Sequence, residues 1–473
     1  MAARIILNAF DMSCVTHQAP GLWRHPDNQA HRYTDLDYWT DLAVTLERGG
    51  FDALFLADVL GVYDVYRDSA APALLDAAQI PLGDPIGQIS AMAAVTQRLG
   101  FGVTVATTYE QPYLLARRFS TLDHLTKGRI GWNVVTSYLD SAARNLGLDT
   151  QIGHDDRYGI AEEFLDVVYK LWEGSWEDDA VVRDREAGVF TDPAKVHPIG
   201  HDGAFFRVPG IHLAEPSPQR TPVVFQAGAS SRGREFAARH GEAIFINGLT
   251  PELTRKATDD IRDRAERLGR PRDTVKILTL ATVVVAPTDE EAQAKLAEYR
   301  GYVSTEGALA LYGGWSGLDL ADHPIDEPLK YIDTDAARSA LSIFTIADPT
   351  RSWTARDIAE YVGIGGIGPV IVGSPATVAD ELERWVEVGG VDGFNLAYVV
   401  TPGSFEEFVE LVVPELRARG RLDDQPGTTL RGRLNGTGDA VVPSWHPAHA
   451  YRGAFTDGPS AADARERETE GAA

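Results

Sequence analysis

The sequence predicts a (β/α)₈ TIM barrel, with long insertions at the C-terminal face of the barrel and an irregular C-terminal tail. Three observations predict this fold class. Strand-like and helix-like stretches alternate along most of the 473 residues, which is the pattern of βα repeats around a parallel sheet. Eight strand-like stretches can be distinguished, the number that closes such a barrel. Polar residues follow the fourth strand-like stretch, and the C-terminal ends of barrel strands are where binding and catalytic residues lie.

The predicted strands are short runs rich in apolar, β-branched and aromatic residues, as a buried parallel sheet requires. The fourth strand is the clearest. Gly128 can adopt the left-handed conformation that ends the preceding helix, and Ile130, Trp132 and Val134 then supply buried side chains. In chain order the predicted strands are residues 4–10, 52–58, 100–109, 129–136, 222–228, 242–247, 275–285 and 392–400.

Helical segments follow nearly all of these strands, as a barrel of βα units requires. Their longer, mixed polar and apolar sequences distinguish them from the compact apolar strands. The predicted helices are residues 35–49, 84–99, 111–127, 158–174, 231–238, 251–268, 289–300, 375–388 and 404–419.

Three insertions interrupt the alternation, near residues 60–82, 175–219 and 302–373. Insertions of this length in a compact domain usually form lids, binding loops or interfaces. We therefore expect one barrel domain over residues 1–420. Residues 421–473 are rich in glycine, proline and charge and are expected to form an extension that wraps the surface or frays.

The charge balance argues against nucleic acid or membrane partners. The chain has 44 lysine and arginine residues against 69 aspartate and glutamate residues, a formal net charge of −25. Such a surface repels phosphate backbones and anionic lipid. The sequence also lacks a signal-peptide pattern and an apolar run of about 18 residues, so we expect a cytoplasmic protein.

Disulfide and metal chemistry are not expected. Cys14 is the single cysteine, so no intramolecular disulfide or cysteine-based metal site can form. His197 with His201, and His446 with His449, lie in proline- and glycine-rich stretches without a metal-binding pattern.

A glycine motif between residues 363 and 368 imitates a dinucleotide fingerprint. Gly363, Gly365 and Gly368 match GxGxxG. A Rossmann loop follows a strand and begins a helix, whereas this motif follows a helical stretch and leads into Pro369 and Val370. We interpret it as a flexible loop.

Several polar residues are candidates for a site, each with a simpler alternative. Asn133 and Ser137 at the end of strand four could bind a ligand or only cap the strand. The stretch 226–233, QAGASSRG, lies between a strand and a helix and suits a phosphate, or is a plain tight turn. His154 and Tyr158 could hold the polar edge of a cofactor, or the neighbouring aspartates only cap a helix. His17, after strand one, is a site residue or a loop donor.

With these residues in view, the chain resembles the bacterial-luciferase-like flavin monooxygenases, in the branch of nitrilotriacetate, dibenzothiophene-sulfone and dimethyl-sulfide monooxygenases. The resemblance extends from about Ile5 to Arg419. It is carried by LNAFDMSCVTHQAPGLWRHP, LERGGFDALFLAD, TLDHLTKGRIGWNVVTSYLDSAARNLG, HDDRY, VFTDPAKVHPI, SPQRTPVVFQAGASSRG and VDGFNLAYVVTPGSFEEFV.

This resemblance implies a two-component enzyme. A separate NAD(P)H-dependent flavin reductase would supply reduced FMN, and O2 would provide one oxygen atom to the substrate and one to water. The missing dinucleotide fingerprint fits this division, because the nicotinamide binds the reductase. The flavin carries the demanding chemistry, and the protein orients it and excludes water.

The resemblance also implies roles for individual residues. His17, Ser137 and Asn133 would be catalytic, with His17 the best donor to the oxygenated cofactor. The flavin would be bound by Asp58, Thr104, Asn133, Ser137, His154, Tyr158, Gly228, Ala229 and Ser230. Phe10, His17, Phe245 and Trp315 would border the substrate.

The substrate is expected to be small and apolar, with an organosulfur compound such as dimethyl sulfide the best candidate. Residues 311–316, LYGGWS, stand where sulfone-type relatives carry a histidine, which indicates an apolar, aromatic lid. Alternatives are oxidative dehalogenation of a halogenated aromatic and a deazaflavin-dependent dehydrogenase on the same fold. A third is a flavin-storing or light-emitting partner subunit, disfavoured because His17 and Ser137 are present. The family resemblance implies a homodimer or homotetramer.

Overall fold

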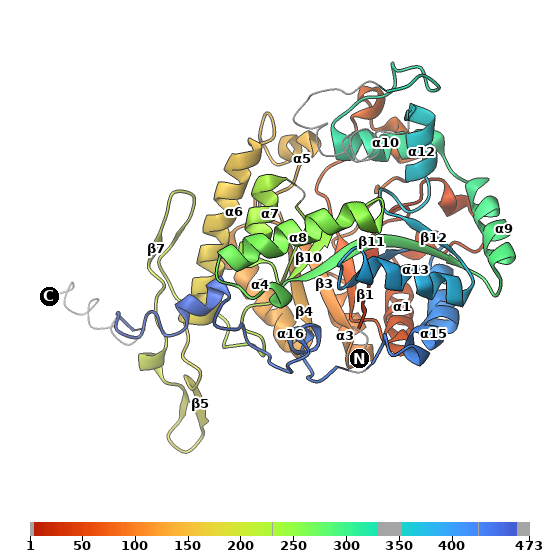
Figure 1. The fold of residues 1–473 in the computed structure, drawn as a ribbon. Helices are drawn as coiled ribbons and strands as arrows, with labels where there is room; N and C mark the ends of the chain where they lie inside the picture. The colour runs from red at the N-terminus through yellow and green to blue at the C-terminus, as the bar shows by residue number, and fades with distance from the viewer. Residues whose placement is uncertain (1–3, 229, 330–351, 424, 461–473) are drawn as a thin grey trace.

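Eight parallel strands close into a barrel in the computed structural model, which describes residues 4–228, 230–329, 352–423 and 425–460 (Figure 1). Neighbouring strands pair in parallel around the circle, and β10 closes it by pairing with β11. All eight predicted strands, and with them the predicted fold class, are confirmed. They are β1 (Ile6–Met12), β2 (Ala53–Ala57), β3 (Gly100–Ala106), β4 (Ile130–Val135), β9 (Val223–Gln226), β10 (Ala243–Ile246), β11 (Lys276–Val285) and β13 (Gly393–Ala397).

The alternation of side chains along the strands divides the core into two parts. On β1, Leu7 and Ala9 pack outward against the helices, whereas Ile6 and Phe10 face the barrel interior with Phe225 of β9. All five are buried. Full burial of each large apolar side chain contributes roughly 1.5–3 kcal/mol, so both layers stabilise the fold.

Helices cover the outside of the barrel, as predicted. One differs clearly in length: the helix expected over residues 84–99 is observed only as α3 (Ile89–Val95), because Asp84 caps the Ile86 N–H and residues 84–88 form a turn. The others are α1 (Leu36–Gly49), α4 (Pro112–Leu125), α6 (His154–Tyr169), α7 (Ser231–His240), α8 (Pro251–Arg267), α9 (Asp289–Arg300), α13 (Pro375–Glu387), α14 (Gly403–Glu407) and α15 (Val413–Ala418).

Two insertions and the segment after β4 form a roof over the C-terminal ends of the strands, at the top of Figure 1. The roof consists of α2 (Ala71–Leu75), α5 (Asp140–Asn145), α10 (Thr305–Ser316) and α12 (Ala355–Val362). Its helices share an apolar core of their own, which includes Ala73, Tyr312 and Ile358. This second core fixes the roof above the barrel mouth.

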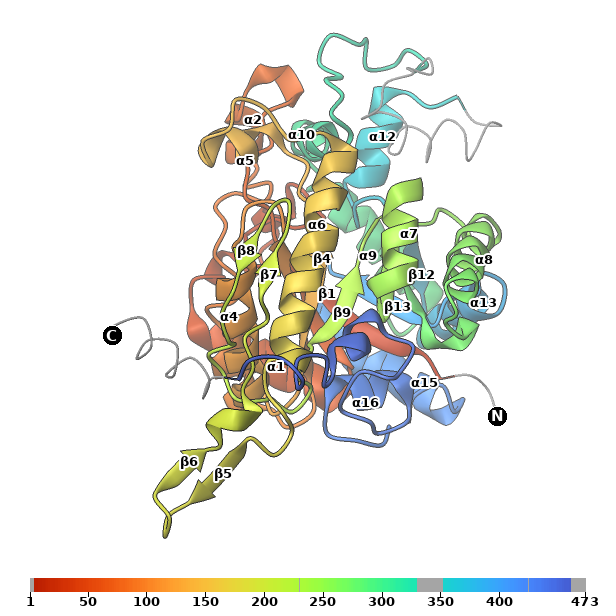
Figure 2. The same cartoon turned by 90° about the vertical axis from the view of Figure 1, so that its left-hand side faces the viewer.

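The insertion at residues 175–219 enters from the other end of the barrel, because it follows a helix and precedes a strand. It forms two hairpins, β5 (Val181–Asp184) with β6 (Val189–Thr191) and β7 (His201–Asp202) with β8 (Arg207–Val208). Figure 2 shows the first hairpin projecting from the body and the second lying along α6. Glu163 of α6 fastens the second hairpin by accepting hydrogen bonds from three backbone N–H groups, those of residues 204–206.

The glycine motif lies between α12 and a strand that was not predicted. A turn occupies residues 363–368, and it leads directly into a ninth strand, β12 (Val370–Gly373), which pairs in parallel with the end of β11. Gly365 and Gly366 have φ angles of 85° and 67°, a region that side-chain-bearing residues rarely adopt. The glycines therefore serve a tight turn at the barrel mouth.

The segment after residue 420 contains a short helix, α16 (Leu430–Asn435), that inserts into the N-terminal end of the barrel. Leu430 and Leu434 join the apolar side chains of the barrel interior. Arg431 is completely buried beside Glu242, with Nε 2.7 Å from Oε2. The expected tail is thus largely irregular, yet part of it closes the bottom of the barrel (Figure 1). Within the described ranges, no helix has the length and apolar character needed to cross a membrane.

Candidate active site

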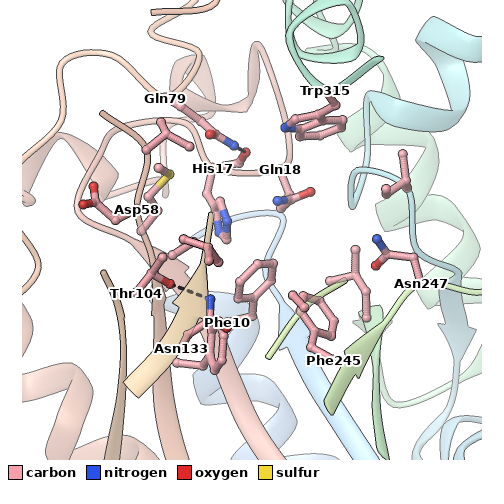
Figure 3. Close-up of a pocket in the computed structure, with 18 of the residues that line it drawn as sticks. Phe10, His17, Gln18, Asp58, Gln79, Thr104, Asn133, Phe245, Asn247 and Trp315 are labelled. Atoms are coloured by element: carbon pink, nitrogen blue, oxygen red, sulfur yellow. Dashed lines mark hydrogen bonds between the residues drawn. The ribbon is translucent and has the colours of Figure 1, made fainter. Parts of the chain in front are cut away.

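A cavity of about 390 Å³ lies between the C-terminal ends of the strands and the roof (Figure 3). The folding of β1, β2, β3, β4 and β10 into one barrel brings residues from distant parts of the sequence to this cavity. Predicted site residues that line it are Phe10, His17, Asp58, Thr104, Asn133, Phe245 and Trp315. A smaller adjoining cavity of about 240 Å³ is lined by Ser137 and shares Asp58 and Thr104.

The two sides of the cavity differ in chemistry. Figure 3 shows Asp58, Thr104 and Asn133 on its left, and Phe245 and Trp315 on its right, where Asn247 is the labelled polar residue. A polar ligand edge can bind on the first side while an apolar molecule occupies the second.

Asn133 of β4 is held in one orientation. Its Nδ2 donates to Thr104 Oγ1 on β3 across 2.9 Å. Its Oδ1 is buried and has no hydrogen-bond partner in the described part of the protein. A buried acceptor without a partner costs free energy, so this oxygen is poised for a ligand N–H group.

Asp58, just after β2, is a largely buried carboxyl. Burial raises its pKa to about 7, the nearby Asp84 carboxylate adds to the rise, and a backbone hydrogen bond at Val59 opposes it. Asp58 can therefore exchange a proton near neutral pH.

His17 lies between two aromatic rings. Its ring centroid is 4.4 Å from that of Phe10 and 6.3 Å from that of Tyr398. Burial lowers the pKa of His17 to about 3, although a backbone hydrogen bond at Phe10 opposes the shift. Nδ1 is buried and finds no partner among the residues described. The imidazole is therefore neutral at physiological pH and has unused hydrogen-bonding capacity.

A chain of hydrogen bonds links the roof to His17. Trp315 Nε1 donates to Tyr63 Oη across 3.1 Å, and Tyr63 Oη donates to Gln79 Oε1 across 2.8 Å. Gln79 Nε2 in turn donates to the His17 carbonyl across 2.9 Å. The Tyr138 hydroxyl lies 2.7 Å from that of Tyr63. The position of Trp315 is thus coupled to the backbone of the His17 loop.

The N-terminus of α7 forms a separate polar site. Ser230 caps the helix by accepting from the Gly233 N–H across 2.9 Å. A Cβ atom on Gly228 would lie 3.1 Å from Tyr158 Oη, and one on Gly233 only 2.6 Å from it. Burial raises the pKa of Tyr158, and a hydrogen bond with Ser230 opposes the rise. Free amides, hydroxyls and a helix terminus suit a phosphate.

One predicted residue, His154, lies apart from this helix terminus. His154 has a side chain that is 48% exposed, with Nδ1 2.8 Å from Asp155 Oδ1. It nevertheless begins α6, one turn before Tyr158, and its ring contacts that of Tyr158 edge-on. Ala229 lies outside the described residues.

The lining residues that sequence reasoning missed include the polar Gln18, Tyr63, Gln79 and Asn247. Asn247 is the last residue of a predicted strand, so the rule that barrel strands deliver site residues at their C-terminal ends would have found it. Gln18 adjoins His17. Tyr63 and Gln79 come from an insertion, where the sequence carries no comparable signal.

The fold and the site together define the class of α/β barrels whose mouth suits a ligand with a polar edge beside an apolar chamber.

The chain belongs to the luciferase-like monooxygenase family, whose sequence profile matches residues 10–392. It is therefore a flavin-dependent oxidoreductase of the monooxygenase type. The chain is 60% identical to the dimethyl-sulfide monooxygenase of Hyphomicrobium sulfonivorans, over 98% of this chain and 97% of the relative. The crystal structure of DmoA from Hyphomicrobium sulfonivorans superposes with a TM-score of 0.92 and 60% identity, over 97% of this chain and 98% of that one.

Two further relatives act on other compounds, according to their names. The long-chain alkane monooxygenase of Geobacillus thermodenitrificans is 52% identical over 96% of this chain and 99% of its own. The dibenzothiophene-sulfone monooxygenase of Rhodococcus erythropolis is 40% identical over 90% of this chain and 95% of its own. The branch predicted from the sequence is thereby confirmed.

Proposed function

We propose that this enzyme is a two-component monooxygenase that uses reduced FMN and O2 to oxygenate a small apolar compound, with dimethyl sulfide the best candidate. The observation that carries this proposal is the two-sided cavity, with Asn133 and Asp58 on one side and Phe245 and Trp315 on the other. The likeness to a dimethyl-sulfide monooxygenase supports the substrate.

The residues present fit FMN. At the α7 terminus, Gly228 and Gly233 leave room that a Cβ would fill beside Tyr158, which supports a phosphate site together with Ser230. At the strand ends, the unpartnered Asn133 Oδ1 offers an acceptor for the N–H edge of an isoalloxazine ring. Thr104, Asp58 and Ser137 would complete that edge, and His154 would approach the ribityl phosphate.

When bound, the flavin supplies the activation of O2 and the transfer of one oxygen atom. His17, kept neutral by burial, would donate a hydrogen bond toward the oxygen that is transferred. Asp58, whose pKa is about 7, would hold or release a proton beside the cofactor's polar edge. The roof and the aromatic side chains would exclude water from the reacting atoms.

A compact substrate suits the apolar side better than a long chain. The cavity of about 390 Å³ must hold the flavin ring as well as the substrate. Leu311 is buried in the roof core, and Trp315 presents its ring to the cavity, so this wall is apolar and aromatic. The same lining would admit a halogenated aromatic, the alternative substrate for this flavin chemistry.

The partners belong to the same proposal. A separate NAD(P)H-dependent flavin reductase would supply the reduced flavin, which favours a cytoplasmic location. Family resemblance further supports a homodimer or homotetramer, which light scattering of the purified protein would measure.

The decisive experiment measures oxygen-dependent turnover with FMN, NADH and an added flavin reductase. Dimethyl sulfide, dibenzothiophene sulfone, nitrilotriacetate and polychlorinated aromatics are compared by product mass. We expect turnover of dimethyl sulfide that requires both reductase and O2. Reduction of added deazaflavin by an alcohol, without any oxygenation, would instead assign the enzyme to the dehydrogenases of this fold.

A further inference from the structure

A second groove, of about 480 Å³, lies outside the barrel wall beside the active site. It is bordered by Leu249 and Pro251 on one side and by Pro369, Val372 and Trp385 on the other. Pro251, Val372 and Trp385 belong to α8, β12 and α13, and Leu249 and Pro369 lie just before α8 and β12. Nothing in the proposed chemistry uses this groove.

The barrel wall is incomplete next to this groove. β13 pairs with one edge of β11 as far as Thr282, and β12 also pairs with Thr282. β12 must therefore lie on the opposite edge of β11, which is the edge that β10 uses. β10 pairs only with Lys276–Thr279, and β12 only with Thr282–Val285. In the described part of the chain β10 and β12 do not pair with each other. The backbone pairing of the wall is therefore interrupted where β10 ends and β12 begins.

Along the chain, a single residue separates the lining of the cavity from the lining of the groove on each border. Asn247 lines the cavity and Leu249 lines the groove. Likewise, Ile367 lines the cavity and Pro369 lines the groove. The intervening residues, Gly248 and Gly368, have no side chains.

Both glycines are held in close contact with the surrounding structure. A Cβ on Gly248 would lie 1.8 Å from Thr254 Oγ1, and one on Gly368 would lie 2.5 Å from Leu280 Cγ. Neither position can accept a side chain without displacing a neighbour. The partition is therefore formed by backbone at these points, and Ile367 is the apolar side chain that it contributes to the cavity.

The chemistry of the groove matches an apolar molecule. Seven of the twelve residues that line it are leucine, isoleucine, proline, valine or tryptophan, and the others are two threonines and three charged residues. The charged groups at its rim are engaged in ion pairs, with Arg384 2.6 Å from Glu252 and Asp380 2.5 Å from Arg419. Charged or strongly hydrated ligands gain little on such a path, whereas a small apolar molecule loses nothing by leaving water.

From this geometry we infer that the gap between β10 and β12 is a lateral portal. Small apolar substrates pass through it from the groove to the cavity, and Ile367 is the side chain that gates it. The inference rests on the proposed function only for the identity of the substrate. It allows substrate to reach the apolar side while flavin occupies the polar side and the barrel mouth.

The passage is tested without turnover. Cys14 is replaced by alanine, and Ile367→Cys places a single thiol on the cavity side of the gap. Its rate of modification by methyl methanethiosulfonate, a small apolar thiol reagent, is measured with saturating FMN. Adding Leu249→Trp, which fills the groove side, should slow the modification at least tenfold. Adding Leu268→Trp, at the far end of α8, is the matched control and should leave the rate unchanged.

An equal modification rate in the Leu249→Trp and Leu268→Trp proteins would overturn the portal. If the tryptophan at position 249 prevents folding, Leu249→Cys in the Cys14→Ala background is blocked after folding with N-phenylmaleimide. The blocked protein should show at least a tenfold loss in kcat/KM for dimethyl sulfide with an unchanged dissociation constant for FMN. Unchanged kcat/KM would also refute the inference.

The portal and the proposed function can fail separately. If Leu249→Trp slows the modification of the thiol at position 367 but the parent enzyme does not oxygenate dimethyl sulfide, the portal is retained and the substrate is rejected. Rapid modification combined with normal turnover would retain the substrate and reject the portal.

Discussion

Asn133 Nδ2 donates to Thr104 Oγ1 across 2.9 Å, between the neighbouring strands β4 and β3. This bond fixes the amide so that its oxygen is the atom left buried without a partner in the described structure. Two strands of the barrel thus cooperate to present a single acceptor. The acceptor exists because the barrel aligns Thr104 directly opposite Asn133 in the parallel register.

Thr104→Val should weaken FMN binding about fivefold to tenfold. The substitution keeps the side-chain shape but removes the acceptor for Asn133, which costs about 1 kcal/mol and lets the amide rotate. Titration of oxidised FMN by fluorescence quenching measures the effect. Thr107→Val is the matched control, since its hydroxyl bonds the Val135 carbonyl and does not line the cavity. Equal dissociation constants for the two variants would remove Asn133 from the cofactor site.

Ser230→Ala should weaken binding of FMN more than binding of riboflavin. The change deletes a hydroxyl at the proposed phosphate site and the cap of α7, which costs roughly 0.5–2 kcal/mol. Riboflavin lacks the phosphate, so its affinity should change by less than twofold. Thr250→Ala, which removes the equivalent cap of α8, controls for helix capping alone. Parallel losses for FMN and riboflavin would contradict a phosphate at this terminus.

Asp11→Asn should stabilise the protein increasingly as the pH rises. Burial raises the pKa of Asp11 to about 7, while a backbone hydrogen bond to Met12 opposes the rise. The folded state therefore keeps a proton that an unfolded aspartate loses near pH 4, so the wild type loses stability from about pH 4 to pH 7. The variant lacks this loss.

Denaturant unfolding at pH 5 and pH 8.5 tests this prediction. The advantage of Asp11→Asn should be larger at pH 8.5 by about 2–4 kcal/mol. Asp149→Asn, at an exposed position, should show no such difference. A pH-independent effect of Asp11→Asn would mean that Asp11 is ionised in the folded state.

Tyr63→Phe should raise the KM for the apolar substrate several-fold while FMN affinity stays within about twofold. Without the hydroxyl, Trp315 Nε1 and Gln79 Oε1 each lose a hydrogen-bond partner, a cost of roughly 1–3 kcal/mol for a buried polar group. The mobility of Trp315 then loosens the apolar wall. Tyr113→Phe, on the outer helix α4, is the control. Steady-state kinetics should show the change in KM for Tyr63→Phe only.

Arg431→Met should lower the unfolding free energy by about 3–5 kcal/mol, because it leaves Glu242 buried without its cation. Adding Glu242→Gln should restore part of the loss, since the unpaired charge is removed. Thermal denaturation of the single and double variants measures both effects. FMN affinity at low temperature should be unchanged, because the pair lies at the opposite end of the barrel from the cavity. A less stable double variant than Arg431→Met would refute this account.

The barrel strands could be predicted because each buries a compact apolar run. The missed strand, β12, pairs with only the end of β11 and closely follows the turn of the glycine motif. Its position depends on the turn at Gly365 and Gly366, which sequence reasoning assessed only against a nucleotide-binding motif.

The residues of the candidate site likewise divide into those that the sequence could predict and those that it could not. Asn133 and Phe245 were predictable because strands deliver them to the barrel mouth in a fixed alternation. Tyr63 and Gln79 were not, because their positions depend on how the roof packs onto the barrel. The burial of Arg431 was not predictable either, because a charged residue in a glycine-rich tail is expected at the surface. Its ion pair with Glu242, which is far away in the chain, allows it to be buried.

The insertion of α16 into the bottom of the barrel has a consequence for biosynthesis. The ribosome releases the chain from its N-terminus, so all eight strands emerge before Leu430, Arg431 and Leu434 do. Until then the apolar floor of the barrel faces water, and Glu242 has no cation. We expect nascent chains halted before α16 to depend on chaperones, because partly assembled α/β chains that expose apolar surface aggregate. A helix translated after all eight barrel strands therefore completes the environment of the first strand.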